Sequence, residues 1–515
     1  MTRHRGLKAL ATALLLALFA ALALPAAGQL AQATWSAPVA LGAGWWQSVA
    51  VDTLGAAHVS WYSNAPGTRL GDALFYTTRP LNGEFAAPRD VIYTGDGGYT
   101  IRNQLAATSD GLLHVLYRAG TDHYFSQALI EQAYLPLGWR APQKLDSGYY
   151  VALLADDQDT LHAISSVQGV NLQTQQALGE VVNLENEPCA FCADLIYRRS
   201  TDRGHTWSQP VNLSNTLSGS EKPNLWQGPS GRLYLIWDEG YDWYVGRGER
   251  DSVRLVYSSD RGLTWSDPVV LDGGGAGPFM GAGAELADGS LLVVWRKSSS
   301  DGDRSIYYQR SADLGLSWSE PQAVPKIVAN LVAESVLDDF ELVLDDTGVA
   351  HLFAVGYMAE NPDPVPGLYH LEFRQGGWRS PTTVYYDPAI RRPEWPRAVI
   401  GPQNDIHLTW FIRFGERLIA GESGLEVMYS YRSPTLPDRP TQAFRPTAAP
   451  PPTAVAAQRF EPTLTPFPTV EPIAQQVNVR TTSDLYAIQT LLAAVFVGLV
   501  LCGGLLALRG FRLRR

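Results

Sequence analysis

The stretch Ser200-Thr-Asp202-Arg-Gly204-His-Thr206-Trp207 occurs three times, with variations, in this chain of 515 residues. The other copies are Ser258-Ser-Asp260-Arg-Gly262-Leu-Thr264-Trp265 and Ser311-Ala-Asp313-Leu-Gly315-Leu-Ser317-Trp318. An apolar, aromatic stretch typical of a β-strand precedes each copy, and a proline follows it. The Asp can accept hydrogen bonds from backbone amides in a turn, the Gly can adopt a positive φ, and the Trp can pack beneath the loop. The repeat therefore predicts a series of β-hairpins.

Four-strand units recur from Thr34 to Ser433, each with polar turns between its apolar strands. The period of about 50 to 70 residues fits the blades of an all-β propeller with variable loops. We expect seven blades, with six as the alternative if one decorated loop has been counted as a blade. The first strands are expected to begin near Gln47, Ile101, Tyr150, Glu221, Phe279, Phe340 and Glu394.

The last unit lacks a fourth strand before the composition changes. The stretch Thr34-Trp-Ser-Ala-Pro-Val-Ala-Leu41 is similar to Thr264-Trp-Ser-Asp-Pro-Val-Val-Leu271, the strand that follows the second copy of the repeat. We therefore predict that this N-terminal strand completes the last sheet, which closes the ring and removes an open sheet edge.

The repeated motif resembles the Asp-box (BNR) repeat of sialidases and related β-propellers, and residues 34–433 form the expected sialidase-like propeller. The resemblance covers a whole blade from Ala284, through Arg296, to the copy at Ser311. Sialidases have six blades. In a propeller the Asp-box turns point away from the face that carries the site, so we predict a structural role for their central residues: Asp202, Gly204, Trp207, Asp260, Gly262, Trp265, Asp313, Gly315 and Trp318.

Both ends of the chain predict a membrane protein. A basic stretch precedes the apolar run Ala9–Leu24, which indicates a signal peptide over 1–28 with cleavage as late as residue 33; an uncleaved anchor is the alternative. The Pro/Thr/Ala-rich segment 434–484 predicts a disordered stalk. The apolar run 485–508 is long enough to span a bilayer, and the basic tail 509–515 is then cytoplasmic. We expect a single-pass cell-membrane protein with an extracellular propeller.

The net charge and the cysteine spacing argue against some classes of partner and cofactor. The net charge of -11 argues against a nucleic-acid partner. Cys189 and Cys192 form a lone CxxC, which is half of a zinc site, so a local disulfide is the main interpretation and a redox function the alternative. We expect no metal and no cofactor.

Five arginines at strand ends are the predicted carboxylate-binding groups, since converging guanidinium groups bind a carboxylate through bidentate, charge-assisted bonds. The resemblance implies this chemistry, because sialidases bind the carboxylate of sialic acid in this way; Arg296 corresponds best to an arginine of that family. The alternative is that these arginines pair with local acids. The five are Arg102, Arg118, Arg296, Arg397 and Arg413.

The predicted catalytic groups are Glu221, Tyr241 and Asp238, with Asp242 as an alternative acid. A sialidase-like mechanism needs a tyrosine nucleophile polarised by a glutamate, plus an acid. The sequence departs from the family at the head of the strand Phe279–Ala282, which has no carboxylate, and it has no Arg-Ile-Pro signature. One hypothesis is an exo-glycosidase for sialic acid or a related acidic sugar. The alternatives are a non-catalytic receptor or adhesin that binds a glycan or protein, and a structural scaffold.

Overall fold

The computed structural model describes only part of the chain, and the described residues all belong to the first of two compact units, 1–439 and 440–515. Within them no helix is long and apolar enough to cross a membrane. The predicted signal peptide, stalk, membrane segment and tail lie outside them. The described residues are 35–64, 71–93, 102–131, 135–170, 189, 191–216, 218–242, 245–247, 252–271, 278–297, 302–330, 340–360, 365–387, 391–414 and 425–433.

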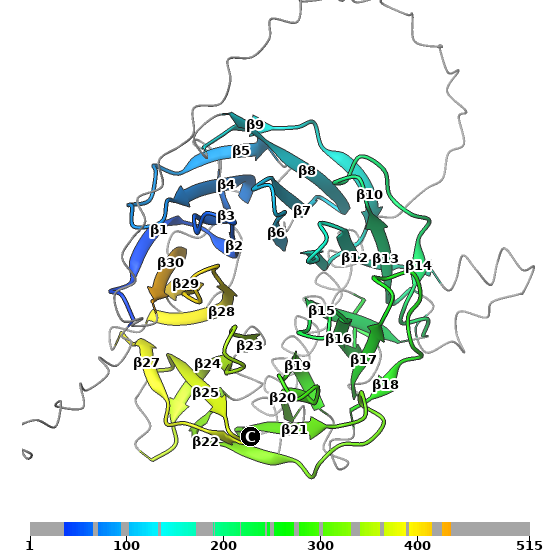
Figure 1. The fold of residues 1–515 in the computed structure, drawn as a ribbon, viewed down its shortest axis with the longest axis vertical. Helices are drawn as coiled ribbons and strands as arrows, with labels where there is room; N and C mark the ends of the chain where they lie inside the picture. The colour runs from blue at the N-terminus through cyan, green and yellow to red at the C-terminus, as the bar shows by residue number, and fades with distance from the viewer. Residues whose placement is uncertain are drawn as a thin grey trace, which may run out of the picture. The chain divides into compact units, whose positions relative to one another are not determined.

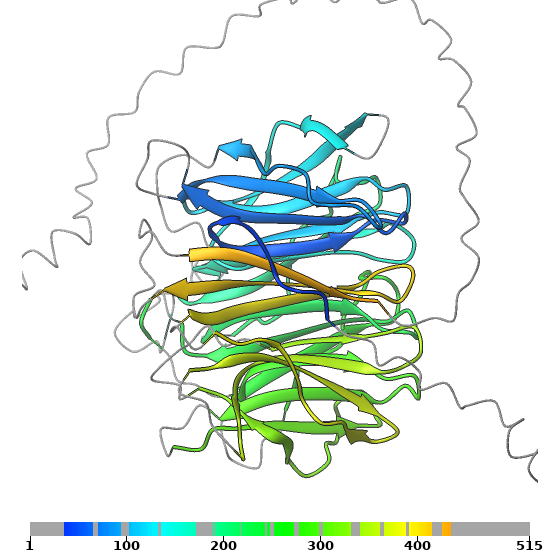
Figure 2. The ribbon, with the colours of Figure 1, turned by 90° about the vertical axis from the view of Figure 1, so that its left-hand side faces the viewer.

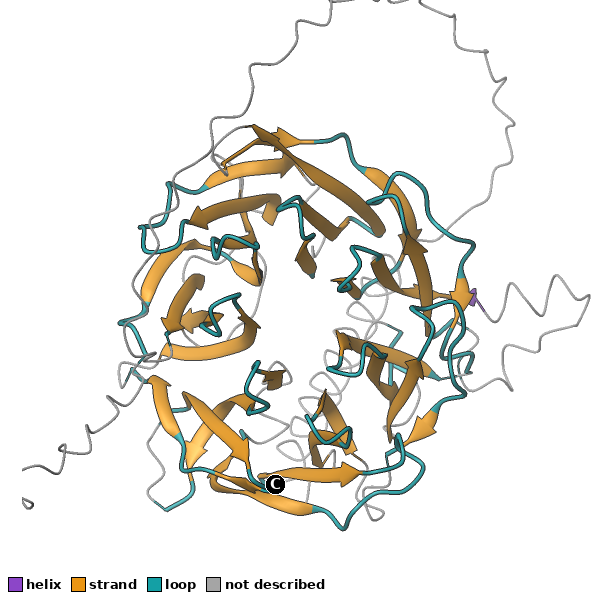
Figure 3. Cartoon of the chain, in the orientation of Figure 1, coloured by secondary structure: helices purple, strands orange, loops and turns teal. Residues whose placement is uncertain are grey.

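Antiparallel sheets are arranged around a central axis, and almost all of the described structure is strand or loop (Figures 1 and 3). We name each unit by its inner strand, the strand that lies nearest the axis. The first units are β2 (Trp45–Val51), β3 (Ala57–Asn64), β4 (Gly71–Arg79), β5 (Arg89–Tyr93); then β6 (Asn103–Ala107), β7 (Leu113–Ala119), β8 (Asp122–Glu131), β9 (Leu135–Trp139), β10 (Gln143–Ser147).

In the β11 and β15 units, as in the β2 unit, the strands follow one another in chain order across the sheet. Their strands are β11 (Val151–Ala155), β12 (Leu161–Gln168), β13 (Ala193–Ser200), β14 (Val211–Asn212); then β15 (Gly219–Gln227), β16 (Leu233–Gly240), β17 (Ser252–Ser258), β18 (Val269–Val270). The remaining strands are β19 (Pro278–Glu285), β20 (Leu291–Lys297), β21 (Ser305–Ser311), β22 (Gln322–Val328), β23 (Phe340–Leu344), β24 (Ala350–Met358), β25 (Gly367–Arg374), β26 (Gly377–Trp378), β27 (Thr382–Tyr385), β28 (Arg391–Ile400), β29 (Ile406–Phe414) and β30 (Leu425–Arg432).

The N-terminal strand closes the ring. β1 (Val39–Ala43) pairs antiparallel with β30 and gives the sheet order β1-β30-β29-β28. Ser36 extends this pairing, since its amide donates to the carbonyl of Tyr431. The β28 unit thus gains its fourth strand from the other end of the propeller sequence, as predicted, although the paired strand begins at Val39 rather than Thr34.

Neighbouring inner strands contact one another all the way around the axis, from β28 to β2, β6, β11, β15, β19, β23 and back to β28. Figure 2 shows the sheets from the side, with strands running between two faces. The number of blades stays a prediction, because the β19 and β23 units belong to one nine-stranded sheet, joined where Ile327 and Val328 pair with β24.

The Asp-box turns connect the third strand of a unit to its fourth, and the three copies have the same hydrogen bonds. In the second copy, Asp260 accepts the Thr264 amide at 2.8 Å, and the Ser258 hydroxyl accepts the Gly262 amide at 2.8 Å. Trp265 packs edge-on against Tyr197 of the preceding unit, with ring centroids 5.1 Å apart. The Asp-box tryptophans therefore also hold neighbouring units together.

Buried Asp–His–Tyr networks recur in the β2, β11 and β28 units, at the same end as the Asp boxes. In the β11 unit, His162 Nδ1 lies 2.7 Å from the Tyr197 hydroxyl and His162 Nε2 lies 3.3 Å from Asp156 Oδ2. Burial raises the pKa of Asp156, but hydrogen bonds from His162 and from turn amides outweigh it and lower that pKa to about 2. The equivalent networks are Asp52–His58–Tyr76 and Asp405–His407–Tyr429.

Candidate functional site

The heads of the inner strands form the site-facing end, opposite the Asp boxes. The pairing of β2, β15, β19 and β28 with their neighbours shifts by a β-bulge. Each bulge contains a residue with a positive φ. This backbone conformation is unfavourable for residues other than glycine. Arg102, one residue before β6, also has a positive φ, of 87°. The bulge residues are Trp46 (φ 52°), Lys222 (φ 50°), Met280 (φ 55°) and Trp395 (φ 58°).

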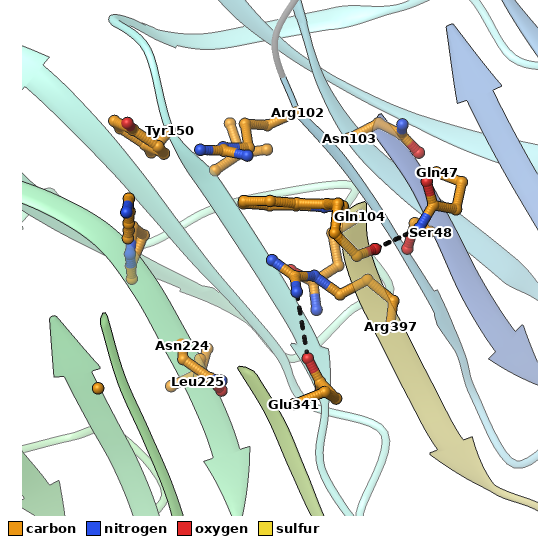
Figure 4. A pocket seen from close by; sticks show the side chains of 15 residues that line it. Gln47, Ser48, Arg102, Asn103, Gln104, Tyr150, Asn224, Leu225, Glu341 and Arg397 are labelled. Carbon is orange, nitrogen blue, oxygen red and sulfur yellow. Dashed lines mark hydrogen bonds and ion pairs between the residues drawn. The ribbon is translucent and has the colours of Figure 1, made fainter. Parts of the chain in front are cut away.

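A narrow pocket of about 60 Å³ lies on the axis among these bulges. Its described lining includes three basic side chains, Arg102, Lys222 and Arg397, and one acidic side chain, Glu341. Figure 4 shows Arg397 directed at Glu341, and their closest atoms are 3.4 Å apart. Amide side chains from Gln47, Asn103, Gln104 and Asn224 complete the polar wall. This composition suits a small, negatively charged group.

Aromatic rings surround the guanidinium group of Arg102. Its Cζ lies 3.6 Å from the ring centroid of Trp395, 4.4 Å from that of Tyr150 and 4.6 Å from that of Trp46. Arg397 also lies against Trp395, with its Cζ 3.8 Å from the centroid. Such contacts stabilise a cation and hold its plane in one orientation. Arg102 is thus a fixed positive group at the entrance to the axis.

The tyrosine that contacts Glu221 is Tyr150. Its hydroxyl donates to Glu221 Oε2 at 3.4 Å, and both side chains are buried. Tyr150 precedes β11, whereas Glu221 lies in β15, so neighbouring units bring them together. The pair lies beside Arg102, because the same Tyr150 ring packs against that guanidinium. A tyrosine, a carboxylate and a cation therefore meet at one point.

The other predicted catalytic residues lie nearby with different partners. Asp238 is opposite Glu221 in the β15–β16 register, accepts the Gly281 amide at 3.3 Å and lies 3.9 Å from Lys222 Nζ. Tyr241 follows β16 and is not among the residues that line the axial pocket. The hydrogen bond from Tyr150 adds a second tyrosine to the predicted Tyr241–Glu221 couple, which stays a prediction.

Two of the five predicted arginines lie together, and the convergence of all five stays a prediction. Only Arg102 and Arg397 line the axial pocket. Arg413 donates to Glu394 Oε1 at 2.6 Å, and both are buried, so this arginine forms the local ion pair of the alternative hypothesis. Arg296 is buried and donates to the carbonyl of Asn330.

Arg118 lies against another tyrosine of the site-facing end. Its Cζ is 4.6 Å from the ring centroid of Tyr149. Burial raises the pKa of Tyr149, and the positive charge of Arg118 opposes this. Tyr149 is therefore a neutral aromatic residue beside the Tyr150–Glu221 pair at neutral pH.

A disulfide supports the loop that carries Tyr241. Cys189 and Cys192 are bonded, with Cα atoms 5.2 Å apart. The next amide, that of Ala193, donates to Asp242 Oδ2 at 2.9 Å, and Asp242 Oδ1 accepts the Val245 amide. Asp242 thus holds the backbone on both sides of it, and its alternative role as an acid stays a prediction.

Sequence reasoning did not select Tyr150, Trp395, Lys222 or Glu341. Their position in the sequence could have identified three of them: Tyr150, Lys222 and Trp395 each lie at the head of a predicted inner strand. Pocket residues recur at this position around the axis. Searching every strand head for polar and aromatic residues would have found them.

Comparisons with known proteins agree with the repeat. Residues 138–339 match the model of the BNR repeat-like domain. A sialidase from Clostridium perfringens is 28% identical over an alignment of 163 residues that covers 26% of this chain and 41% of the relative. A similar segment, 27% of this chain, is 28% identical to a sialidase from Paraclostridium sordellii and covers 42% of it. The chain thus spans less than half the length of the sialidases that it matches.

Solved structures share the fold. An ulvan lyase of a polysaccharide lyase family superimposes with a TM-score of 0.53 at 12% identity, over 76% of this chain and 95% of the lyase. The same class of lyase, solved with the saccharide -[GlcA(1-4)Rha3S]-, gives a TM-score of 0.52. At this identity the likeness shows the propeller fold alone.

Proposed function

The chain is a sialidase-like β-propeller of the Asp-box (BNR) repeat family, and from this premise we propose that its axial pocket binds the anionic group of an acidic glycan. The observation that carries the proposal is the gathering of Arg102, Lys222 and Arg397 around one small pocket. Charge-assisted hydrogen bonds from such groups recognise carboxylates and sulfates. The matched sialidases support a sugar as the carrier of that anion.

We further propose that the protein is an exo-acting glycosidase for sialic acid or a related acidic sugar, and that Tyr150 and Glu221 are catalytic residues. The hydrogen bond to Glu221 polarises the Tyr150 hydroxyl, because a carboxylate accepts the proton as the oxygen attacks the anomeric carbon. Arg102 stabilises negative charge on the same tyrosine through its proximity. Asp238, opposite Glu221, is the proposed acid that protonates the leaving oxygen.

Turnover of fluorogenic sialosides and uronides by the purified full-length protein tests this mechanism. We expect Tyr150→Phe to lower kcat by about 100-fold or more, since loss of a nucleophile or its proton acceptor has effects of this order. Tyr257→Phe, on β17, is the matched control and should not change kcat. An active wild-type protein that keeps its activity in Tyr150→Phe would exclude the proposed nucleophile.

A non-catalytic receptor or adhesin is the second candidate, and two observations favour it. The head of β19 carries Phe279 and Met280 in place of a carboxylate, and Arg413 is held by Glu394. A wild-type protein that binds acidic glycans on an array without turning them over identifies this function. Absence of both binding and turnover would refute both forms of the proposal.

We also propose that the protein displays a seven-bladed propeller at the cell surface. The apolar run 485–508 and the arginines that follow it support a single membrane anchor with an external propeller. The contact of successive inner strands supports counting the nine-stranded sheet as two blades. Protease treatment of intact cells should remove the propeller; a propeller released by osmotic lysis without detergent would contradict the anchor.

A further inference from the structure

One unit departs from the repeated Asp–His–Tyr network. In the β2, β11 and β28 units a tyrosine on the third strand contacts the histidine, but His370 occupies this position in the β23 unit. The register proves the equivalence, because Tyr76 pairs with Ser60, two residues after His58, and His370 pairs with Phe353, two residues after His351. Glu372 is then the cross-strand partner of His351.

Because His370 replaces the tyrosine, three side chains that can bind a metal ion lie close together. The nitrogens His351 Nδ1 and His370 Nε2 are 2.8 Å apart, and one ligand atom from each of His351, His370 and Glu372 lies within 4.8 Å of the others. Two imidazole nitrogens and a carboxylate oxygen are a ligand set that Zn²⁺ and similar divalent ions accept, with a further position open to water. Both histidines are buried.

The surroundings have the features of a supported metal site. His351 Nε2 lies 3.2 Å from Asp345 Oδ2, and this carboxylate accepts two turn amides through its other oxygen. Metal-binding histidines commonly donate their second N–H to such a carboxylate, which fixes the ring and its tautomer. The equivalent Asp–His contact exists in the β2, β11 and β28 networks, so the aspartate has the same place whether the third strand presents a tyrosine or a histidine.

Solvent and ions have access to this cluster. A cavity of about 630 Å³ is lined by His370 and Glu372, and its other wall includes Trp35 and Arg432. Arg432 holds Glu372 Oε1 at 2.8 Å, which orients the carboxylate. The contact from Arg374 to Oε2 is longer, 3.6 Å, and comes from a half-exposed side chain, so a metal ion can displace it.

We propose that His351, His370 and Glu372 bind a divalent transition-metal ion, with Zn²⁺ the best fit. The site lies on β24 and β25, away from the inner strands, and is independent of glycan binding. Trp35 packs edge-on against His370, with ring centroids 5.4 Å apart, so the metal also stabilises the region where the N-terminal segment joins the propeller.

Calorimetric titration of the EDTA-treated full-length protein with Zn²⁺ tests the site, and Co²⁺ absorption reports nitrogen coordination. We expect one equivalent to bind and to raise the melting temperature. His370→Tyr is the matched variant, because it restores the network of the other units; it should fold and lose Zn²⁺ binding. Asp345→Asn should weaken binding about 10- to 100-fold, as loss of an outer carboxylate does.

Glu372→Thr provides a second variant, since Thr78 occupies the equivalent position in the β2 unit. It keeps the test decisive if His370→Tyr does not fold. No Zn²⁺ binding by the wild-type protein would overturn the proposal. Binding of equal strength in Glu372→Thr and in any folded His370→Tyr would do the same, because the ion would then be held elsewhere.

Discussion

The two ends of the units are built in different ways. At the Asp-box end, each turn forms its hydrogen bonds within a few residues of sequence, and the copies match: Asp202, Asp260 and Asp313 each accept the amide four residues later at 2.8 to 2.9 Å. At the axial end, the contacts join different units, such as Tyr150 to Glu221, 71 residues apart. Local repetition therefore builds the frame, and unique contacts between units build the pocket.

The largest effect we expect comes from the Asp-box end. Gly262 has φ +74°, and an added Cβ would lie 1.8 Å from the Tyr197 hydroxyl of the preceding unit. Gly262→Ala should lower the free energy of unfolding by about 3 kcal/mol, because it combines a left-handed backbone with steric overlap. Urea denaturation measures this change.

Gly111→Ala is the control for Gly262→Ala. Gly111 has φ +80°, but an added Cβ would have no neighbour within 4 Å, so only the backbone cost of about 1 kcal/mol remains. Equal destabilisation in both variants would show that the close approach between units has no cost.

The next effect tests the buried networks through pH. The pKa of Asp156 is lowered from 3.8 to about 2 in the folded protein. A lowered carboxyl pKa stabilises the fold above pH 3.8, and this stabilisation is lost as the pH falls from about 4 to 2. Asp156→Asn should therefore lower the free energy of unfolding by about 2 kcal/mol at pH 6 and by about half as much at pH 3.

Asp267→Asn, at an exposed loop position, is the control for Asp156→Asn and should change stability by less than about 0.5 kcal/mol at either pH. A loss in Asp156→Asn that is the same at pH 6 and pH 3 would mean that the carboxylate charge does not stabilise the network.

The same contrast explains what could be predicted from the sequence. The Asp boxes and the first strands were found from local patterns, and the observed inner strands begin within three residues of the predicted positions. Each of these features depends on neighbours in the sequence, so its pattern survives without coordinates.

The pocket was only partly predictable, because its contacts depend on closure of the ring. Arg102 and Arg397 were selected as strand-end cations, and they share the pocket. The ring between them, Trp395, packs on Arg102 of a different unit, almost 300 residues away in sequence. Tyr150 was not selected, because its hydrogen bond to Glu221 joins two units and spans 71 residues of sequence.

The smallest effect we expect separates the two kinds of arginine. Arg102→Lys keeps the positive charge but loses the planar group that packs between Trp395 and Tyr150. Affinity for an acidic glycan, measured by calorimetry, should fall about tenfold, or about 1.4 kcal/mol, because lysine does not reproduce the stacked geometry.

The matched variant is Arg203→Lys at the Asp-box end. Arg203 forms an ion pair with Asp110 at 2.9 Å, and its side chain is 47% exposed. Lysine can form the same exposed pair, whose contribution is small, so glycan affinity should not change and stability should change by less than about 0.5 kcal/mol. If Arg102→Lys bound the glycan as tightly as Arg203→Lys, charge alone would define the axial pocket. The aromatic contacts would then serve the fold, and the axial end would differ from the Asp-box end in charge but not in the precision of its contacts.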